Sequence, residues 1–227
     1  MGKALVLSMI LVILSGCARS APPSSGPSST SEPGVRAVTK TTEDQNRQET
    51  REVAPASQGE KDVADRSRAA ILAIKKGDWG AFSTMVHPDK GVRFSPYAYV
   101  RTQKDGDLVL TAERLKKGFS DESKYTWGSY DGTGDQIRLT IEEYYRKFIY
   151  DLDFTEAPKV AQNQILGRGN TLNNLREAYP GAPFVEYHFP GLDPKYQGMD
   201  WRSLRLVFEQ KDGVWYVVGI IHDQWTI

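Results

Sequence analysis

Apolar residues recur at the three- and four-residue spacing of amphipathic helices in several parts of the chain. The Gly77-Asp78 step separates the first two of these stretches, which predicts two short helices or one kinked helix. Thr140 and Glu143 form the pattern of a capping box, and the strongest helical periodicity follows directly. The predicted helices cover residues 63–74, 79–86, 111–119, 141–149 and 172–179.

Runs of β-branched and aromatic residues predict strands between and after these helices. Pro96 restricts the first of them to a sheet edge or a bulge. Asp212-Gly213, between the last two runs, is the dipeptide of a tight hairpin turn. The predicted strands cover residues 92–100, 108–110, 125–130, 184–189, 204–209 and 214–221.

The hairpin turn also predicts a register, obtained by counting outward from Asp212 and Gly213. Because strand residues alternate between faces, a slip by one residue would exchange the two sets of side chains. One predicted face pairs Phe208 with Val217, Leu206 with Gly219, Leu204 with Ile221 and Arg202 with Asp223. The other pairs Glu209 with Tyr216, Val207 with Val218, Arg205 with Ile220 and Ser203 with His222.

The order of elements, helices first and strands after, predicts an α+β fold with N-terminal helices on one face of a curved antiparallel sheet. All 8 Phe, 5 Trp and 11 Tyr follow residue 60. Residues 61–227 are therefore expected to form a single globular domain. Lys plus Arg and Asp plus Glu number 29 each, and this balance disfavours nucleic acid as a partner.

The N-terminus has a different composition. Lys3 precedes an apolar run from residue 4 to 14, and small residues follow up to Cys17, the only cysteine. This layout is typical of a secretory signal and is too short to span a bilayer, which needs about 20 apolar residues. The alternatives to a signal that is cut before Cys17 and modified there are a retained membrane anchor and a plain secretory signal. With Cys17 consumed by processing, no thiol is left for a disulfide, a zinc site or a nucleophile.

Leu14-Ser15-Gly16-Cys17 resembles a bacterial lipoprotein signal. The resemblance implies that residues 1–16 are removed and that Cys17 carries a diacylglyceryl group. Two acyl chains give stable anchoring to a membrane. Residues 17–60 would then be the lipidated cysteine and a disordered Ser/Pro-rich tether, since the segment lacks aromatic residues and has only three valines as large aliphatics.

Two further resemblances concern the domain itself. Residues 70–79, 86–89 and 201–227 resemble the nuclear-transport-factor-2-like, or cystatin-like, superfamily, which implies a cone-like fold with a space between sheet and helices. Residues 86–100, 125–134 and 199–227 resemble a group of bacterial lipoproteins of single-membrane cells with no established activity. The resemblance to these lipoproteins implies the outer leaflet of the plasma membrane as the location.

Few residues offer chemistry. His188 shares a strand face with Glu186, as an acid/base pair or as part of a polar outer face. Arg202 and Asp223 are expected to form an ion pair. If that pair lines the cone, Arg202 would hold an anionic ligand, and Trp201 and Trp225 would supply apolar walls. His222 and Trp225 complete the candidate pocket, which comprises His188, Arg202, His222, Asp223 and Trp225. His87, before Pro88, is expected to cap or pack.

Other patterns argue against specific sites. Asp131-Gly-Thr-Gly-Asp135 lacks the remaining ligands of a calcium loop and is expected to be a tight turn. Residues 167–170 are too short for a phosphate loop, and known hydrolase signatures are absent from the sequence. We therefore expect no metal and no cofactor.

These observations favour a membrane-anchored, extracytoplasmic binding module on the cell membrane, without catalytic activity. Its partner would be a small molecule, an envelope polymer or another protein. A lyase, isomerase or hydrolase that uses His188 or His222 with Asp223 and a tyrosine is the alternative. A homodimer formed through the sheet is a third expectation.

Overall fold

The computed structural model describes residues 56–226. The predicted signal peptide, Cys17 and most of the predicted tether lie outside these residues. The helices are α1 (Gln58–Lys75), α2 (Trp79–Ser83), α3 (Ala112–Lys116), α4 (Ile141–Phe148) and α5 (Leu175–Ala178), with short 3-10 helices η1 (Gly118–Ser120), η2 (Phe154–Glu156) and η3 (Pro194–Tyr196). The strands are β1 (Val92–Ser95), β2 (Val109–Leu110), β3 (Tyr125–Ser129), β4 (Gln136–Leu139), β5 (Lys159–Gln162), β6 (Phe184–Phe189), β7 (Arg202–Lys211) and β8 (Val214–Gln224).

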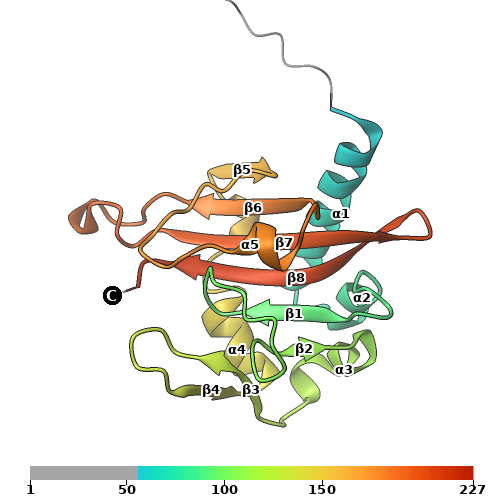
Figure 1. Ribbon diagram of the computed structural model, residues 1–227, viewed down its shortest axis with the longest axis horizontal. Helices are drawn as coiled ribbons and strands as arrows, with labels where there is room; N and C mark the ends of the chain where they lie inside the picture. The colour runs from blue at the N-terminus through green and yellow to red at the C-terminus, as the bar shows by residue number, and fades with distance from the viewer. Residues whose placement is uncertain (1–55, 227) are drawn as a thin grey trace, which may run out of the picture. The chain divides into compact units, whose positions relative to one another are not determined.

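A six-stranded sheet organises the domain, in the order β2-β1-β8-β7-β6-β5 (Figure 1). β3 and β4 form a separate two-stranded ribbon. The prediction of a wholly antiparallel sheet is wrong at one place, because β1 runs parallel to β8. All the other strands lie between these two in sequence, so β1 and β8 meet through a long connection rather than a hairpin. The predicted α+β class is otherwise confirmed.

Capping side chains set the helix ends. Thr140 and Glu143 form the predicted capping box of α4. Ser57 and Glu60 form a second capping box, so α1 begins at Gln58, inside the segment predicted as tether. α1 thus begins three residues before the domain boundary predicted at residue 61. α2 and α5 are each shorter than the predicted helices at 79–86 and 172–179.

Both faces of the sheet are covered. On one face, α1 and α4 pack over the main core, which includes Val185, Leu206 and Ile220. On the other, α5 covers a smaller cluster that includes Phe184, Val207 and Ile221 and lies toward the viewer in Figure 1. Helices on one face were predicted, whereas the second covering layer was not.

A bulge in the β7–β8 hairpin overturns most of the predicted register. The turn is as predicted, with positive φ at both Asp212 and Gly213, and the pairs Phe208–Val217 and Glu209–Tyr216 are confirmed. Val218 is then left without a partner, because Val207 pairs with Gly219. Every later pair shifts by one residue: Leu206 faces Ile220, Arg205 faces Ile221, Leu204 faces His222, Ser203 faces Asp223 and Arg202 faces Gln224.

Gly219 lies at the bulge, where no side chain would fit. A Cβ at this position would lie 2.8 Å from the Tyr179 hydroxyl oxygen, which packs from the α5 side. Val218 and Gly219 both face that side, and glycine permits the close approach. The shift places Asp223 beside Arg205 instead of opposite Arg202.

Candidate functional site

The structure distributes the five candidate pocket residues over two faces of the sheet. Strand alternation and the bulge put His188 and Asp223 on the α5 face, and Arg202 and His222 on the face of α1 and α4. Trp225 follows β8 and is 43% exposed. They therefore do not meet in one pocket, and the predicted contact between Arg202 and Asp223 is wrong.

A fully buried ionic network lies on the α5 face. Arg205, 0% exposed, donates from Nε to Glu186 Oε2 at 2.8 Å and from Nη1 to Asp223 Oδ2 at 2.9 Å. Its Nη2 donates to Glu186 Oε1 at 3.1 Å and to the Gly167 carbonyl at 3.0 Å. Buried charges are tolerated when such partners satisfy them, so each charge in this network depends on the presence of the others.

Glu186 and Asp223 respond differently to this arginine. Burial would raise the pKa of the Glu186 carboxyl, but Arg205, Ser203 and the Gly167 N–H together lower it. Burial raises the pKa of Asp223, which Arg205 only partly offsets. Glu186 is therefore the ionised partner that Arg205 holds most firmly.

His188 enters the same network through Ser203. Its Nδ1 lies 2.8 Å from Ser203 Oγ, and Ser203 donates to Glu186 Oε1 at 2.6 Å. Since the Ser203 proton goes to Glu186, Nδ1 of His188 is the donor to Ser203. Burial lowers the pKa of His188, so the ring is neutral near pH 7. The predicted proximity of His188 and Glu186 is thus indirect, through Ser203.

A segment before α5 closes over this network. The Leu166 and Gly167 N–H groups donate to the two Glu186 carboxylate oxygens at 3.0 and 2.8 Å. A Cβ on Gly167 would lie 2.6 Å from the Trp201 ring, so glycine is required for the close approach. Gly167, the first residue of the 167–170 segment, thus bonds the chain before α5 to the sheet through Glu186 and Arg205.

On the α4 face, Asp151 contacts Arg202 and His222 in a polar group that is more accessible than the Arg205 network. Of these three residues, only Asp151 was not among the predicted pocket residues. Asp151 Oδ2 lies 3.0 Å from Arg202 Nε and 3.3 Å from His222 Nε2. His222 is 0% exposed, and its Nδ1 lies 3.3 Å from the Pro96 carbonyl oxygen. Asp151 Oδ1 is buried without a partner among residues 56–226. Asp151 is 71 residues from His222 in sequence, so no local motif points to the contact.

The contacts of Asp151 with His222 and Arg202 determine the pKa of its carboxyl. Burial alone would raise the pKa of Asp151, but His222 and Arg202 lower it below 3.8. A lowered pKa means that ionised Asp151 stabilises the fold above pH 3.8 and that this contribution is lost as the pH falls through the folded pKa. We expect His222→Gln to raise the Asp151 pKa, measured by NMR titration. An unchanged pKa would show that Arg202 alone holds the carboxylate.

Aromatic side chains occupy the space between the sheet and α4. The Trp127 and Tyr144 rings stack with centroids 3.9 Å apart, and Phe94 contacts both edge-on at 5.3 and 6.0 Å. Phe148 packs against Tyr144 and against the His222 ring. Trp127, Tyr144, Phe94 and Phe148 are each at most 2% exposed. This interior is packed protein core.

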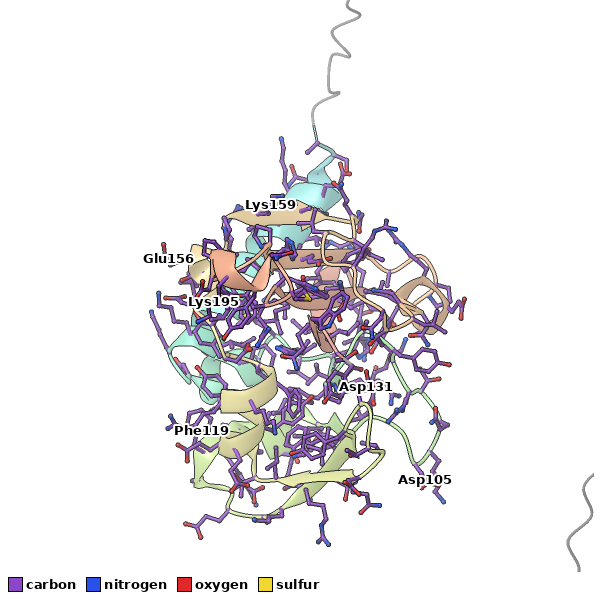
Figure 2. The ribbon with its side chains drawn as sticks, turned by 90° about the vertical axis from the view of Figure 1, so that its left-hand side faces the viewer. Asp105, Phe119, Asp131, Glu156, Lys159 and Lys195 are labelled. Atoms are coloured by element: carbon purple, nitrogen blue, oxygen red, sulfur yellow. The ribbon has the colours of Figure 1, made fainter. Side chains whose placement is uncertain are left out.

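An open groove lies elsewhere on the same side, between α1 and the edge strand β5. Its volume is about 490 Å³, within the range of about 300–1,000 Å³ for small-molecule sites. Glu156 of η2 and Lys159, the first residue of β5, are labelled in Figure 2 and show the end of the domain at which β5 lies. One wall comes from Arg68, Ile71 and Leu72 of α1, and the floor from Val160 and Gln162 of β5 and Val185 of β6.

The remaining sequence predictions concern turns, metals and membranes. His87 caps the turn after it, because its Nδ1 accepts from the Asp89 and Lys90 N–H groups, each at 3.2 Å. Residues 131–135 form the predicted turn, closed by the Tyr130 N–H to Asp135 carbonyl bond. Within residues 56–226 no three His, Cys, Asp or Glu side chains cluster as metal ligands. No helix in that range has the length and apolar character to cross a bilayer.

No protein-family model and no curated protein matches the chain. Solved structures that are similar over most of their own length include three with 11–12% sequence identity to this chain. A candidate calcium/calmodulin dependent protein kinase II association domain from Xanthomonas campestris has 11% identity and a TM-score of 0.32, covering 75% of this chain and 90% of that one. Aln2 from a Streptomyces species has 11% identity and a TM-score of 0.34, covering 75% and 93%.

An NTF-2 like protein of unknown function from Shewanella oneidensis MR-1 has 12% identity and a TM-score of 0.30, covering 73% of this chain and 99% of that one. Identities and TM-scores at this level carry no conclusion about activity. The structure itself contains the arrangement that the sequence resemblance implies, with helices packed on one face of a curved sheet.

Proposed function

We propose that this chain is a lipid-anchored, extracytoplasmic binding module without catalytic activity. The observation that supports this most is where the polar groups lie. Glu186 and Arg205 pair below the surface and His188 bonds to Ser203, whereas the open groove beside β5 is mainly apolar. A site for chemistry needs reactive groups that a substrate reaches. A groove of this composition suits binding.

The anchoring part of the proposal is supported by sequence alone. Lys3, the apolar run to Leu14 and the Gly16-Cys17 pair have the order of a lipoprotein signal. Two acyl chains on Cys17 would hold the protein at the membrane, since one chain gives only marginal binding and two give stable anchoring.

Membrane fractionation of a Cys17→Ser variant tests the anchor. We expect the wild-type chain in the membrane fraction with a mass increased by acylation, and the variant without added mass and released from the membrane. Ser15→Ala, which leaves the cysteine in place, is the matched control and should remain anchored. An unmodified wild-type chain, or a variant that stays membrane-bound, would contradict lipid anchoring.

The enzymatic alternative has one observation in its favour, the contact of Asp151 with both His222 and Arg202. His222, however, is 0% exposed, and both of its ring nitrogens already face protein oxygens. We therefore assign this group to the fold. Loss of a measured activity in a folded His222→Gln variant would reverse that assignment.

A further inference from the structure

The groove between α1 and β5 combines exposed aliphatic side chains with hydrogen-bond donors. Leu72 is 47% exposed and Val160 is 55% exposed, and both line the groove. Contiguous apolar surface of this kind marks a binding site more often than scattered single residues do. The apolar part of a ligand would therefore lie along Leu72, Ile71 and Val160.

The polar groups of the groove define the head group of the ligand. Arg68 is the one charged residue among the described residues that line it. Within residues 56–226 its guanidinium pairs only with Asp65 of the same helix. Both side chains are about two-thirds exposed, so the pair contributes little to stability and is readily exchanged. Gln162 Nε2 is buried and has no hydrogen-bond partner among the described residues.

Arg68 and the Gln162 amide are both donors, so the group that completes the groove is an acceptor. The lining that residues 56–226 provide contains no carboxylate side chain, and the positive charge of Arg68 is complementary to an anion. An aliphatic tail with an anionic acceptor at one end meets all of these requirements. We propose that the groove binds a free fatty acid, with the chain along the α1–β5 floor and the carboxylate toward Arg68. This inference rests on the proposed function, because it names the ligand of the binding module.

Titration with dodecanoate, kept below the concentration at which it forms micelles, tests the proposal. The protein is the full chain carrying Cys17→Ser, so that no covalent lipid competes. We expect saturable binding of dodecanoate, and weaker binding of dodecanol and of dodecyltrimethylammonium, which have the same chain with a neutral or a positive head. Equal binding of all three would show non-specific apolar association and overturn the proposal.

Two variants locate the site. Val160→Asp places a carboxylate on the groove floor and should weaken dodecanoate binding at least about tenfold. Val109→Asp is the matched control, because Val109 is a partly exposed valine on the opposite edge strand, β2, and should leave binding unchanged. Arg68→Gln should weaken dodecanoate binding about tenfold and leave dodecanol binding unchanged, since only the charged head contacts the guanidinium.

Equal affinities of the Val160→Asp and wild-type chains would overturn the placement in the groove. Retention on phosphatidylglycerol vesicles without dodecanoate binding would identify a lipid surface as the occupant and overturn the fatty-acid assignment. In either case the release of the Cys17→Ser chain from membranes is measured separately. Failure of the ligand assignment is thus distinguishable from failure of the anchoring proposal.

Discussion

Arg205→Met should destabilise the domain by about 3–5 kcal/mol, because it removes the cation and leaves two carboxylates in the interior. Glu186 and Asp223 lose their ion pairs, and the Gly167 carbonyl loses its donor. Domain stabilities are typically about 5–15 kcal/mol, so this loss is large. The measurement is the free energy of unfolding from denaturant titration.

Arg202→Met is the control for this prediction. Arg202 also pairs with an aspartate, but its side chain is partly exposed, and we expect a loss of about 1 kcal/mol or less. Similar stabilities of the Arg205→Met and wild-type proteins would show that water reaches the carboxylates. The network on the α5 face would then be open to a ligand, contrary to the present assignment.

Trp127→Ala should cost about 3–5 kcal/mol of unfolding free energy, because it empties the centre of the aromatic core. The Trp127 ring is 0% exposed, stacks on Tyr144 and packs against Phe94, and its Nε1 donates to the Leu139 carbonyl at 2.9 Å. Removal therefore loses transfer free energy, ring contacts and one hydrogen bond.

Trp225→Ala is the matched control, since Trp225 is 43% exposed and should change the unfolding free energy by about 0.5 kcal/mol or less. Denaturant titration of both variants gives the comparison. Equal losses in the two variants would mean that the space around Trp127 is loosely filled. The space between the sheet and α4 would then be a candidate ligand site.

Elements with complete local signals were predicted well from the sequence. The capping box at Thr140 and the apolar spacing after it define α4, and Asp212-Gly213 defines the β7–β8 turn. Both signals lie within a few residues of the structure they determine. β5 was missed, because Lys159-Val-Ala-Gln162 is short and half polar and pairs only through the distant β6.

The candidate site was harder to predict because one bulge decides which side chains meet. Gly219 within a strand was the available signal, since interior glycines often mark bulges. Without it, Asp223 was placed opposite Arg202, whereas the structure pairs Asp223 with Arg205 and Arg202 with Asp151. The Arg205–Glu186 contact joins two different strands, and nothing in the local sequence of either indicates it.

The most direct test of a filled cone and an open groove is a map of backbone amide chemical shifts as dodecanoate is added to the Cys17→Ser chain. We expect shifts at Leu72, Val160 and Gln162, with Trp127, Tyr144 and Phe148 unaffected. Saturable shifts at Trp127, Tyr144 and Phe148 instead would place the binding site inside the cone and contradict a filled interior.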